Sequence, residues 1–417
     1  MIDQPKQCVL LCGGKGNRLL PFTSSMPKPM IPCNGRPFLW HLLNQVNEQG
    51  INEFLLLTGY LGNHIKKYFG DGSDWGWKIK YSEGRPNWGT GQRIWEAQNK
   101  LEDKFLLLYS DNFVPFPFKK LVSMHNKNKL PLTLMVSEKS PGNIEVGDSG
   151  IVTKYNSKRS KKLKYVEIGY MIAEKKKTIS CFKNMEESFS EVIETMAIQK
   201  KISALIQLDK YHSISDPVRW KKAKYYLQPK KIILLDRDGV INVKQEKGGY
   251  VSKWKHFEFI PESINGLRSL SQEGFKFIVI SNQAGIKRGL VDVVDLEEIH
   301  SMMIKELSKE GVEVLDVYYC PHFIEDNCNC RKPKSGMFYR VSEDWLLRLD
   351  QTLYIGDSLT DVQAANTAGT KSIFLGNSAD LEELTNLELP LRNFKNLGLA
   401  VPFILKHFKK EILYDYH

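Results

Sequence analysis

Six short apolar runs, each followed by a stretch of helical character, constrain the fold of this chain more than any other feature. The first three are CVLLC (8–12), FLLLT (54–58) and FLLLY (105–109), and the last three are IILLD (232–236), FIVIS (277–281) and TLYIG (352–356). Strands that are apolar throughout are buried on both faces, and their alternation with helices is typical of parallel sheets. The sequence therefore predicts two α/β units.

Length and one interruption divide the chain. A chain of 417 residues is too long for one ordinary hydrophobic core, which favours two or three domains. A basic helical stretch ends in KYYLQPKK (224–231), where Pro229 interrupts it, and strand-like character resumes at Ile232. We predict a first domain over 1–228, a second over 229–385, and a C-terminal tail over 386–417 with strand fragments and one amphipathic helix.

Composition and charge limit the kinds of molecule that we expect this protein to bind. No apolar run approaches the roughly 18–20 residues of a membrane span, and the N-terminal stretch MIDQPKQCVLLCGGKG is too poor in apolar residues for a signal peptide. We therefore expect a cytoplasmic protein with no membrane partner. The net charge of +11 is compatible with nucleic-acid binding, but the basic runs KRSKKLK (158–164) and KKK (175–177) lack aromatic residues that stack on bases. We expect phosphorylated small molecules, not nucleic acid, to use this charge.

Aspartates follow two of the later apolar runs. LLDRDGVIN (234–242) places Asp236 and Asp238 just past one strand, and YIGDSLTD (354–361) places Asp357 and Asp361 after another. Open α/β sheets carry their sites at the carboxyl ends of the strands. There one carboxylate can attack phosphorus, a second can move protons, and others can hold the magnesium ion that this chemistry needs. Each aspartate alone is a weak signal, because an aspartate after a strand is often a helix cap.

Two more polar residues complete an ordered set. ISNQAG (280–285) ends the intervening strand with Ser281, a hydroxyl donor, and CRKPKSG (330–336) supplies Lys332, a positive charge for a phosphoryl group. The order Asp-x-Asp, Ser, Lys and Gly-Asp-x-x-x-Asp resembles the four motifs of the haloacid dehalogenase superfamily of phosphohydrolases. The resemblance implies a Rossmannoid fold, Asp236 as nucleophile, Asp238 as acid and base, and Ser281 and Lys332 as phosphoryl ligands. It also implies Mg²⁺ held by Asp236, Asp357 and the backbone carbonyl of Asp238, with Asp361 in or near the shell.

Three cysteines and a histidine lie within CPHFIEDNCNC (320–330), and a disulfide, a metal site or chance could produce such a cluster. Thiols stay reduced in the cytoplasm, which favours the metal over the disulfide. Together with GGYV (248–251) and SNQAGIKRG (281–289), the cluster resembles the heptose-1,7-bisphosphate phosphatase and histidinol-phosphatase branch. That branch binds zinc here, which implies a closed structural Zn²⁺ site with four ligands: Cys320, His322, Cys328 and Cys330.

Two loops bear on the substrate of the second half. GIKRG (285–289) is similar to the heptose-bisphosphatase pattern, whereas the short stretch from His322 to Cys328 is closer to the histidinol-phosphatase type. We favour heptose bisphosphate, with histidinol phosphate as the alternative. We predict that Arg288 and Arg331 contact the phosphate that does not react, and that Asn282 is a further substrate contact.

A glycine-rich loop follows the first apolar run. In LLCGGKGNRLLPFTSSMPKPM (10–30) the glycines let backbone amides approach a phosphate chain closely, and two basic residues add charge. The spacing fits neither a Walker loop nor a dinucleotide-binding fingerprint. With PKP (27–29), WGTGQ (88–92), YSDN (109–112) and VEIGY (166–170), the pattern resembles sugar-1-phosphate nucleotidyltransferases over about residues 6–227.

This second resemblance implies a Rossmann-like nucleotidyltransferase fold and nucleotidyl transfer from a nucleoside triphosphate, with GTP favoured, to a sugar 1-phosphate. It implies Asp111 as a magnesium ligand. Lys158 falls where the resemblance implies a lysine that binds the sugar phosphate, although Ser157 precedes it where a glutamate is usual. The implied contacts to nucleotide or sugar are Gly13, Gly14, Gly16, Arg18, Lys28, Gly89, Thr90, Gly91, Lys158, Glu167 and Gly169.

The first half departs from the family that it resembles at the second metal ligand. The family has an aspartate in a pattern like Asp-Ile-Gly-Thr-Pro, whereas this chain has YHSISDPVRW (211–220), with Ser213 at that place. Three alternatives follow: Asp111 suffices, Asp216 reaches in, or the domain binds nucleotide or sugar without turnover. Removing the C7 phosphate of a heptose 1,7-bisphosphate leaves a sugar 1-phosphate, which the first half would use. That relation favours a bifunctional enzyme of nucleotide-activated heptose synthesis over a phosphatase with a non-catalytic first half.

Overall fold

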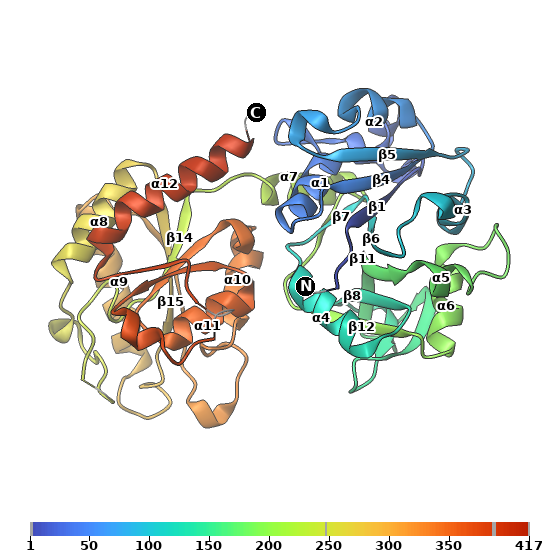
Figure 1. Ribbon diagram of the computed structural model, residues 1–417. Helices are drawn as coiled ribbons and strands as arrows, with labels where there is room; N and C mark the ends of the chain where they lie inside the picture. The colour runs from blue at the N-terminus through green and yellow to red at the C-terminus, as the bar shows by residue number, and fades with distance from the viewer. Residues whose placement is uncertain (1–2, 247, 386–388, 416–417) are drawn as a thin grey trace. The chain divides into compact units, whose positions relative to one another are not determined.

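The computed structural model describes residues 3–246, 248–385 and 389–415, and the chain divides into two compact units, Met1–Gln228 and Pro229–His417 (Figure 1). Each unit has its own sheet and its own hydrophobic core. The prediction of two α/β units is confirmed. Within the described ranges, no helix combines the length and the hydropathy that a membrane span needs.

The first unit is built on a nine-stranded mixed sheet. β1 pairs in parallel with β4 and β6, because the run QCVLLC is buried along its whole length and offers apolar side chains to both faces. β11 continues the sheet antiparallel to β6, and β8 and β12 extend it from β11. The strands are β1 (Gln7–Cys12), β4 (Glu53–Thr58), β5 (Lys78–Glu83), β6 (Lys104–Tyr109), β8 (Leu132–Glu138), β9 (Gly142–Val146), β10 (Val152–Ser160), β11 (Tyr165–Glu174) and β12 (Ile202–Gln207).

Local sequence sets the helix boundaries of the first unit. Ser188 and Glu191 form a reciprocal capping box at the start of α6, and Asp216 followed by Pro217 starts α7. Two short ladders, β2 (Pro32–Cys33) with β3 (Arg36–Pro37) and β7 (Asn112–Phe113) with β13 (His212–Ser213), tie loops together. The helices are α1 (Phe38–Glu48), α2 (Gly62–Phe69), α3 (Thr90–Glu96), α4 (Phe118–Asn128), α5 (Lys175–Ile179), α6 (Phe189–Ile198) and α7 (Pro217–Tyr226).

The second unit has a six-stranded sheet, every adjacent pair of which is parallel. Its strand order is β16-β15-β14-β17-β18-β19. Alternate residues of β14 serve opposite faces: Ile233 and Leu235 join one core cluster, and Ile232 and Leu234 join the other. The strands are β14 (Ile232–Leu235), β15 (Lys276–Asn282), β16 (Val314–Cys320), β17 (Leu353–Gly356), β18 (Lys371–Leu375) and β19 (Arg392–Phe394).

Helices cover both faces of the second sheet (Figure 1). Side chains of α8, α9 and α12 belong to one core cluster, and those of α10 and α11 belong to the other. This layering leaves the carboxyl edge of the sheet, where loops connect strands to helices, as the place for polar groups. The helices are α8 (Pro261–Gln272), α9 (Val293–Lys309), α10 (Gly336–Trp345), α11 (Leu359–Ala368) and α12 (Leu397–Asp415).

The stretch predicted as a separate C-terminal tail is integrated into the second unit. β19 pairs in parallel with β18 at the edge of the sheet, and α12 packs against α8. Leu397 and Ile404 are fully buried, and the ring of Phe408 meets that of Phe275 at 4.7 Å. The apolar face of α12 therefore completes the core of this unit. Residues 386–388 and 416–417 of the predicted tail lie outside the described residues.

Candidate functional site

Three aspartates of the second unit come together at one edge of its sheet. Asp236 follows β14, Asp357 follows β17, and Asp361 lies in the first turn of α11. One carboxylate oxygen from each lies within 4.8 Å of the others. β14 and β17 are parallel neighbours, so the residues after their carboxyl ends meet at the same edge.

Lys332 supplies positive charge at this edge. Its ammonium nitrogen lies 2.9 Å from Asp236 Oδ1 and 2.7 Å from Asp361 Oδ1, and the side chain is buried. It also donates hydrogen bonds to the Ile280 carbonyl and the Tyr354 hydroxyl, at 2.9 and 2.7 Å. Burial lowers the pKa of Lys332, but the charges of Asp236 and Asp361 outweigh it and raise that pKa above its ordinary value. Lys332 is therefore a buried cation.

The same carboxylates form an oxygen-rich, anionic environment. Burial and the charges of Asp361 and Asp357 raise the pKa of Asp236 to about 7, against the opposing effect of Lys332. Asp357 Oδ1 is buried and has no hydrogen-bond partner within the described part of the chain. Its other oxygen accepts from Lys244 at 2.7 Å. Mg²⁺ prefers carboxylate oxygens, so the donor set fits magnesium held by Asp236 and Asp357.

Asp361 is more fully engaged by the protein. Its Oδ1 accepts from Lys332 and from the Tyr354 hydroxyl, the latter at 2.9 Å. Its Oδ2 accepts from the Ser358 hydroxyl at 2.7 Å and from the backbone amides of Asp357 and Ser358. These bonds make Asp361 the charge partner of Lys332 and the partner of Ser358 in the capping box at the start of α11. Its part in holding a metal stays a prediction.

Magnesium binding to the second unit is expected to weaken as the pH falls through 7. The metal binds an ionised carboxylate, and Asp236, whose pKa is raised to about 7, must lose its proton first. With one linked proton, the dissociation constant should be about tenfold larger at pH 6 than at pH 8. Calorimetric titration of the magnesium-free protein at constant ionic strength measures this ratio. Asp236→Asn should remove the ratio, and equal constants at both pH values in the unsubstituted protein would contradict the prediction.

The end of β15 contributes to the same edge. Ser281 is buried there, and Gln283 donates to its hydroxyl at 2.8 Å. Asn282 exchanges two hydrogen bonds of 3.1 Å with the backbone of Lys332. Through Gln283, which also donates to Asp238, Ser281 is connected to the aspartates of the site. Its role as a phosphoryl ligand stays a prediction. The side-chain amide of Asn282 holds the Lys332 backbone, and its predicted contact with the substrate stays a prediction.

Asp238 is held by three side chains. Arg237 donates to its two carboxylate oxygens at 3.0 and 2.9 Å, and Asn242 and Gln283 each donate at 2.9 Å. Burial would raise the pKa of Asp238, but Arg237 and these amides hold it below its ordinary value. The sequence analysis missed Arg237 and Gln283. Their place inside the motifs DRDGVIN and SNQAG was the only signal, and it does not say where either side chain goes.

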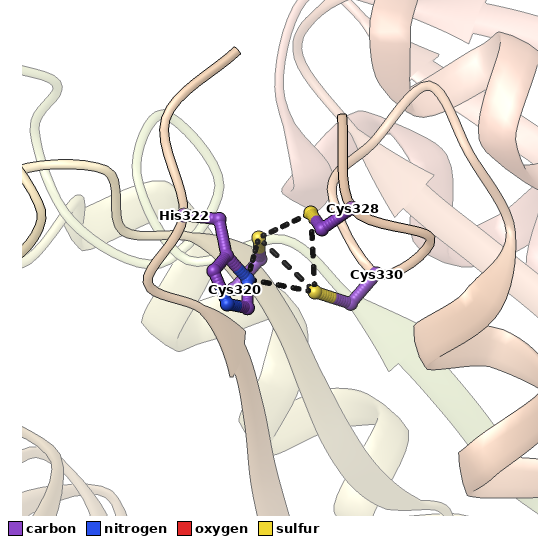
Figure 2. Close-up of side chains that lie close together, drawn as sticks. All are labelled: Cys320, His322, Cys328 and Cys330. Carbon is purple, nitrogen blue, oxygen red and sulfur yellow. Dashed lines mark hydrogen bonds between the residues drawn. The ribbon is translucent and has the colours of Figure 1, made fainter. Parts of the chain in front are cut away.

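The four predicted zinc ligands face one another on the loop 320–330, here called the Cys/His loop (Figure 2). The sulfur of Cys330 lies 3.3 Å from that of Cys320 and 3.4 Å from that of Cys328, and 3.6 Å separates Cys320 from Cys328. His322 Nδ1 lies 3.2 Å from Cys330 Sγ and 3.6 Å from Cys320 Sγ. The three cysteines are free thiols, too far apart for a disulfide bond of about 2.05 Å.

The geometry of these donors suits zinc. Tetrahedral zinc with Zn–S bonds of about 2.3 Å separates its sulfur ligands by about 3.8 Å, close to the distances between the thiols. Three sulfur atoms and one imidazole nitrogen are the ligand types of structural zinc sites, and four ligands leave no open position. A metal here would hold the loop and would not take part in chemistry.

Both arginines predicted to contact phosphate touch the Cys/His loop. Arg331 donates to the His322 carbonyl at 3.3 Å, and Arg288 lies over the rings of Tyr250 and Phe323 at 5.9 and 5.6 Å. The loop therefore positions them. Lys244, whose ammonium nitrogen lies 2.7 Å from Asp357 Oδ2, was missed, because nothing in its spacing distinguishes it from a surface lysine.

The first unit contains a cavity of about 470 Å³ beside its glycine-rich loop, within the size range of small-molecule sites. Backbone from GGKGNR and from the start of α3 forms its walls. Eight predicted residues line it, namely Gly13, Gly14, Gly16, Arg18, Lys28, Gly89, Thr90 and Asp111.

Four other predicted residues do not line this cavity. Gly91 leaves no room for a side chain, since a Cβ would fall 2.0 Å from the Glu187 carbonyl oxygen. Gly169 has a φ of +79° and lies against Tyr109, which also requires glycine. Burial and the charge of Asp111 raise the pKa of Glu167 to about 7, so Glu167 is near the predicted metal ligand. Lys158 is exposed on β10.

The residues around Asp111 bear on the missing metal ligand. Lys28 Nζ lies 2.6 Å from Asp111 Oδ2. The ladder of β7 with β13 places Ser213 opposite Asn112, and the Ser213 hydroxyl lies 3.0 Å from that of Ser215. Asp216 accepts from the Arg219 amide at 2.9 Å as the cap of α7. Its carboxylate is therefore occupied, which weighs against the alternative that Asp216 reaches in.

Arg93 is a further residue of this site that the sequence analysis missed. Its buried guanidinium donates to the carbonyls of Thr58, Gly13 and Arg85 at 2.5, 3.2 and 2.8 Å. It lies so close to Gly13 that a Cβ there would come within 2.2 Å of it. Arg93 therefore holds the backbone of the glycine-rich loop at Gly13. In the sequence it looks like an ordinary helix residue.

A second cavity of the first unit, of about 390 Å³, is lined in part by Ser213. Ser215 lines the first cavity, and it is bonded to Ser213 and to Arg219, which line the second. The stretch 213–219 therefore contributes lining residues to both cavities. The second cavity is basic and suits the anionic part of a ligand; its cationic lining consists of Lys139, Lys210, Arg219 and Lys222.

Comparison with known proteins finds a different relative for each half. Residues 7–213 match the family described as Nucleotidyl transferase, and residues 231–380 match the family described as Polynucleotide kinase 3 phosphatase. The D-glycero-beta-D-manno-heptose-1,7-bisphosphate 7-phosphatase of Pseudomonas aeruginosa is 36% identical over 146 residues, which cover 35% of this chain and 81% of the relative.

Two further proteins are similar to parts of this chain. The D-glycero-alpha-D-manno-heptose-1,7-bisphosphate 7-phosphatase of Campylobacter jejuni is 34% identical over 173 residues, which cover 42% of this chain and 95% of the relative. The crystal structure of HddC from Yersinia pseudotuberculosis aligns with a TM-score of 0.46 at 22% identity, and it covers 54% of this chain and 100% of its own.

Proposed function

The chain belongs to the family of the D-glycero-D-manno-heptose-1,7-bisphosphate 7-phosphatases, and from that premise we propose that its second unit hydrolyses the C7 phosphate of a heptose 1,7-bisphosphate. One observation carries the proposal: Asp236, Asp357 and Lys332 meet in a buried cluster at the carboxyl edge of the second sheet. A nucleophile, a metal-binding carboxylate and a fixed cation are the groups that transfer of a phosphoryl group to water requires.

The residues divide the reaction between them. A carboxylate oxygen of Asp236 forms a bond to phosphorus while the bond from phosphorus to the C7 oxygen breaks. Asp238 must first take up a proton, against the lowering of its pKa by Arg237. It gives this proton to the leaving oxygen and then takes one from the water that cleaves the aspartyl phosphate, which releases inorganic phosphate. Lys332 and Ser281 hold the phosphoryl oxygens. Magnesium, when bound by Asp236 and Asp357, neutralises charge between carboxylate and phosphate.

A substrate screen tests the phosphatase. Phosphate release should be fastest from heptose 1,7-bisphosphate and much slower from histidinol phosphate, because the arginines beside the Cys/His loop can hold a second phosphate that histidinol phosphate lacks. A 3′-phosphorylated oligonucleotide belongs in the same screen, since the second half also matches the Polynucleotide kinase 3 phosphatase family. Faster turnover of either competitor would reject the heptose assignment.

We propose that the first unit transfers a nucleotidyl group to the sugar 1-phosphate that the second unit releases. A phosphate oxygen of the sugar 1-phosphate attacks the α-phosphorus of a nucleoside triphosphate, and pyrophosphate leaves. The glycine-lined cavity supports this proposal, because Lys28 and Arg18 lie in it with Asp111. Joining two consecutive steps on one chain raises the effective concentration of the intermediate. The alternative is a first unit that binds ligand without turnover.

Pyrophosphate release distinguishes a first unit that catalyses nucleotidyl transfer from one that only binds ligand. We expect release when heptose 1-phosphate and Mg²⁺ are supplied with a nucleoside triphosphate, and GTP should be the best of the four common triphosphates. The control is the same mixture with Asp111→Asn. No release with any triphosphate would leave the first unit as a binding domain.

Ser213→Asp is expected to raise nucleotidyl transfer by about tenfold or more. It restores a carboxylate where the resembled family has its second metal ligand, opposite Asn112, the residue after Asp111. The effect should appear as a lower magnesium concentration at half-maximal rate. The control is Ser180→Asp, at an exposed serine outside the glycine-rich loop and the cavity. No change in the magnesium dependence would show that Ser213 is not the limiting departure.

A further inference from the structure

Arg237 stands between the two aspartates of the DRD motif, and its side chain is fully buried. Its backbone amide donates to Asp236 Oδ1 at 2.8 Å, while its guanidinium turns to Asp238. Nη2 lies 3.0 Å from Asp238 Oδ1 and 2.9 Å from Oδ2, and Nε lies 3.3 Å from Oδ1. One residue therefore touches both catalytic carboxylates, the first by its backbone and the second by its side chain.

His300 of α9 holds the other end of this guanidinium. Arg237 Nη1 lies 3.1 Å from His300 Nε2, and the imidazole is buried. An arginine can only donate, so Nε2 must accept, and the imidazole is neutral with its proton on Nδ1. Burial and the nearby Arg237 charge lower the pKa of His300 to about 3, which agrees with this neutral form. His300 thus receives a donor of Arg237 that would otherwise be buried without a partner.

Gln283 and Asn242 complete the support around Asp238. Gln283 Nε2 lies 2.9 Å from Asp238 Oδ2 and 2.8 Å from Ser281 Oγ, so it joins the acid to the phosphoryl ligand. Asn242 donates to Oδ1 at 2.9 Å. Asp238 therefore has donors on both oxygens, although about a quarter of its side chain stays exposed at 24%.

From these contacts we propose that Arg237, anchored by His300, is a positioning residue that sets the orientation in which the Asp238 carboxylate meets the leaving oxygen and the hydrolytic water. The planar fork of a guanidinium fixes a carboxylate in two directions at once, which a single ammonium cannot do. Arg237 itself touches neither substrate nor the reacting atoms. The proposal rests on the acid and base role proposed for Asp238.

The test compares two leaving groups in the full-length protein with Mg²⁺ and Zn²⁺ present. A sugar phosphate leaves as an alkoxide and needs a proton from Asp238, whereas 4-nitrophenolate leaves without one. The first turnover of 4-nitrophenyl phosphate, seen as a burst of nitrophenolate, therefore reports attack by Asp236 alone. The steady-state turnover of heptose bisphosphate reports the acid and base steps as well.

Arg237→Lys keeps the charge and loses the fork. We expect its kcat for heptose bisphosphate to fall about 100-fold with KM within about twofold, while the nitrophenolate burst keeps its rate within about threefold. Arg268→Lys, at an exposed ion pair with Glu310, is the matched control and should change neither. Equal loss of burst and turnover would make Arg237 merely structural, and unchanged turnover would reject any role.

His300 gives a second route if Arg237→Lys does not fold. His300→Gln keeps a side-chain acceptor for Arg237 and should retain most of the turnover, whereas His300→Leu removes it and should show the same split between burst and turnover. Equal effects of the two substitutions would overturn the proposal. Asp238→Asn distinguishes failure of the proposed acid from failure of the positioning role. Full turnover in this variant would show that Asp238 is not the acid. If Asp238→Asn loses turnover but keeps the burst, whereas Arg237→Lys and His300→Leu do not, only the positioning role fails.

Discussion

Asp236→Asn is expected to abolish phosphatase turnover, with a loss on the order of 10⁴-fold or more, as for the removal of an attacking group in other covalent mechanisms. An amide oxygen does not form the aspartyl phosphate. The substitution also removes one of the carboxylates that crowd the site, whose mutual repulsion helps to raise the pKa of Asp236 to about 7. The fold should therefore survive, and the loss should be chemical.

Phosphate release from heptose bisphosphate measures the effect, and thermal unfolding checks the fold. Asp344→Asn is the matched control, because Asp344 lies on α10 with a half-exposed side chain that accepts from the Tyr318 hydroxyl. It should keep full activity. Retained turnover in Asp236→Asn would refute the nucleophile and return the assignment to Asp238 or Asp357.

Loss of zinc is expected to have the second largest effect on phosphatase activity. The effect should be indirect, because zinc holds the Cys/His loop. Cys328→Ser should lower bound zinc from about one ion per chain to a small fraction and reduce phosphatase activity by about 10–100-fold, because Arg331 and Lys332 follow the Cys/His loop directly. Added Mg²⁺ should not restore this activity. In contrast, removal of Mg²⁺ alone should stop turnover completely, and its return should restore it.

Metal analysis of the purified protein, together with activity, measures both effects. The matched control is Cys181→Ser in the first unit, a buried cysteine outside the loop, which should keep zinc and phosphatase activity. A protein that contains no zinc yet turns over at full rate would contradict the structural role. Zinc loss that abolishes activity reversibly, without loosening the loop, would instead give the metal a chemical role.

Short sequence motifs, whose residues are close together along the chain, made much of the second unit predictable. Strand, turn and aspartate occur within a few residues of one another in LLDRDGVIN and YIGDSLTD, so the chain itself delivers each carboxylate to a strand end. The Cys/His loop is predictable for the same reason, since its four donors span CPHFIEDNCNC. The packing of α12 into the second unit was harder to predict. Its apolar residues indicate an amphipathic helix, but they do not indicate which surface the helix covers.

Contacts between distant parts of the chain were not predictable in this way. Arg237 meets His300 across 63 residues, Arg93 meets Gly13 across 80, and Lys28 meets Asp111 across 83. Each of these contacts depends on how helices and loops pack on a sheet. A single sequence shows the charge of such a residue, but the partner is set by the packing.

The sequence by itself predicted the two α/β units from its apolar runs. Its resemblance to known families predicted phosphoryl transfer by the strand-end aspartates and zinc ligands in the Cys/His loop. The tertiary structure alone decided which groups are neighbours of those residues. It assigned Asp361 to Lys332, Asn282 to the Lys332 backbone, Asp216 to the cap of α7 and Asp238 to Arg237. The physical reason is that a buried charge or amide must find a partner, and only the folded chain fixes which partner lies within reach.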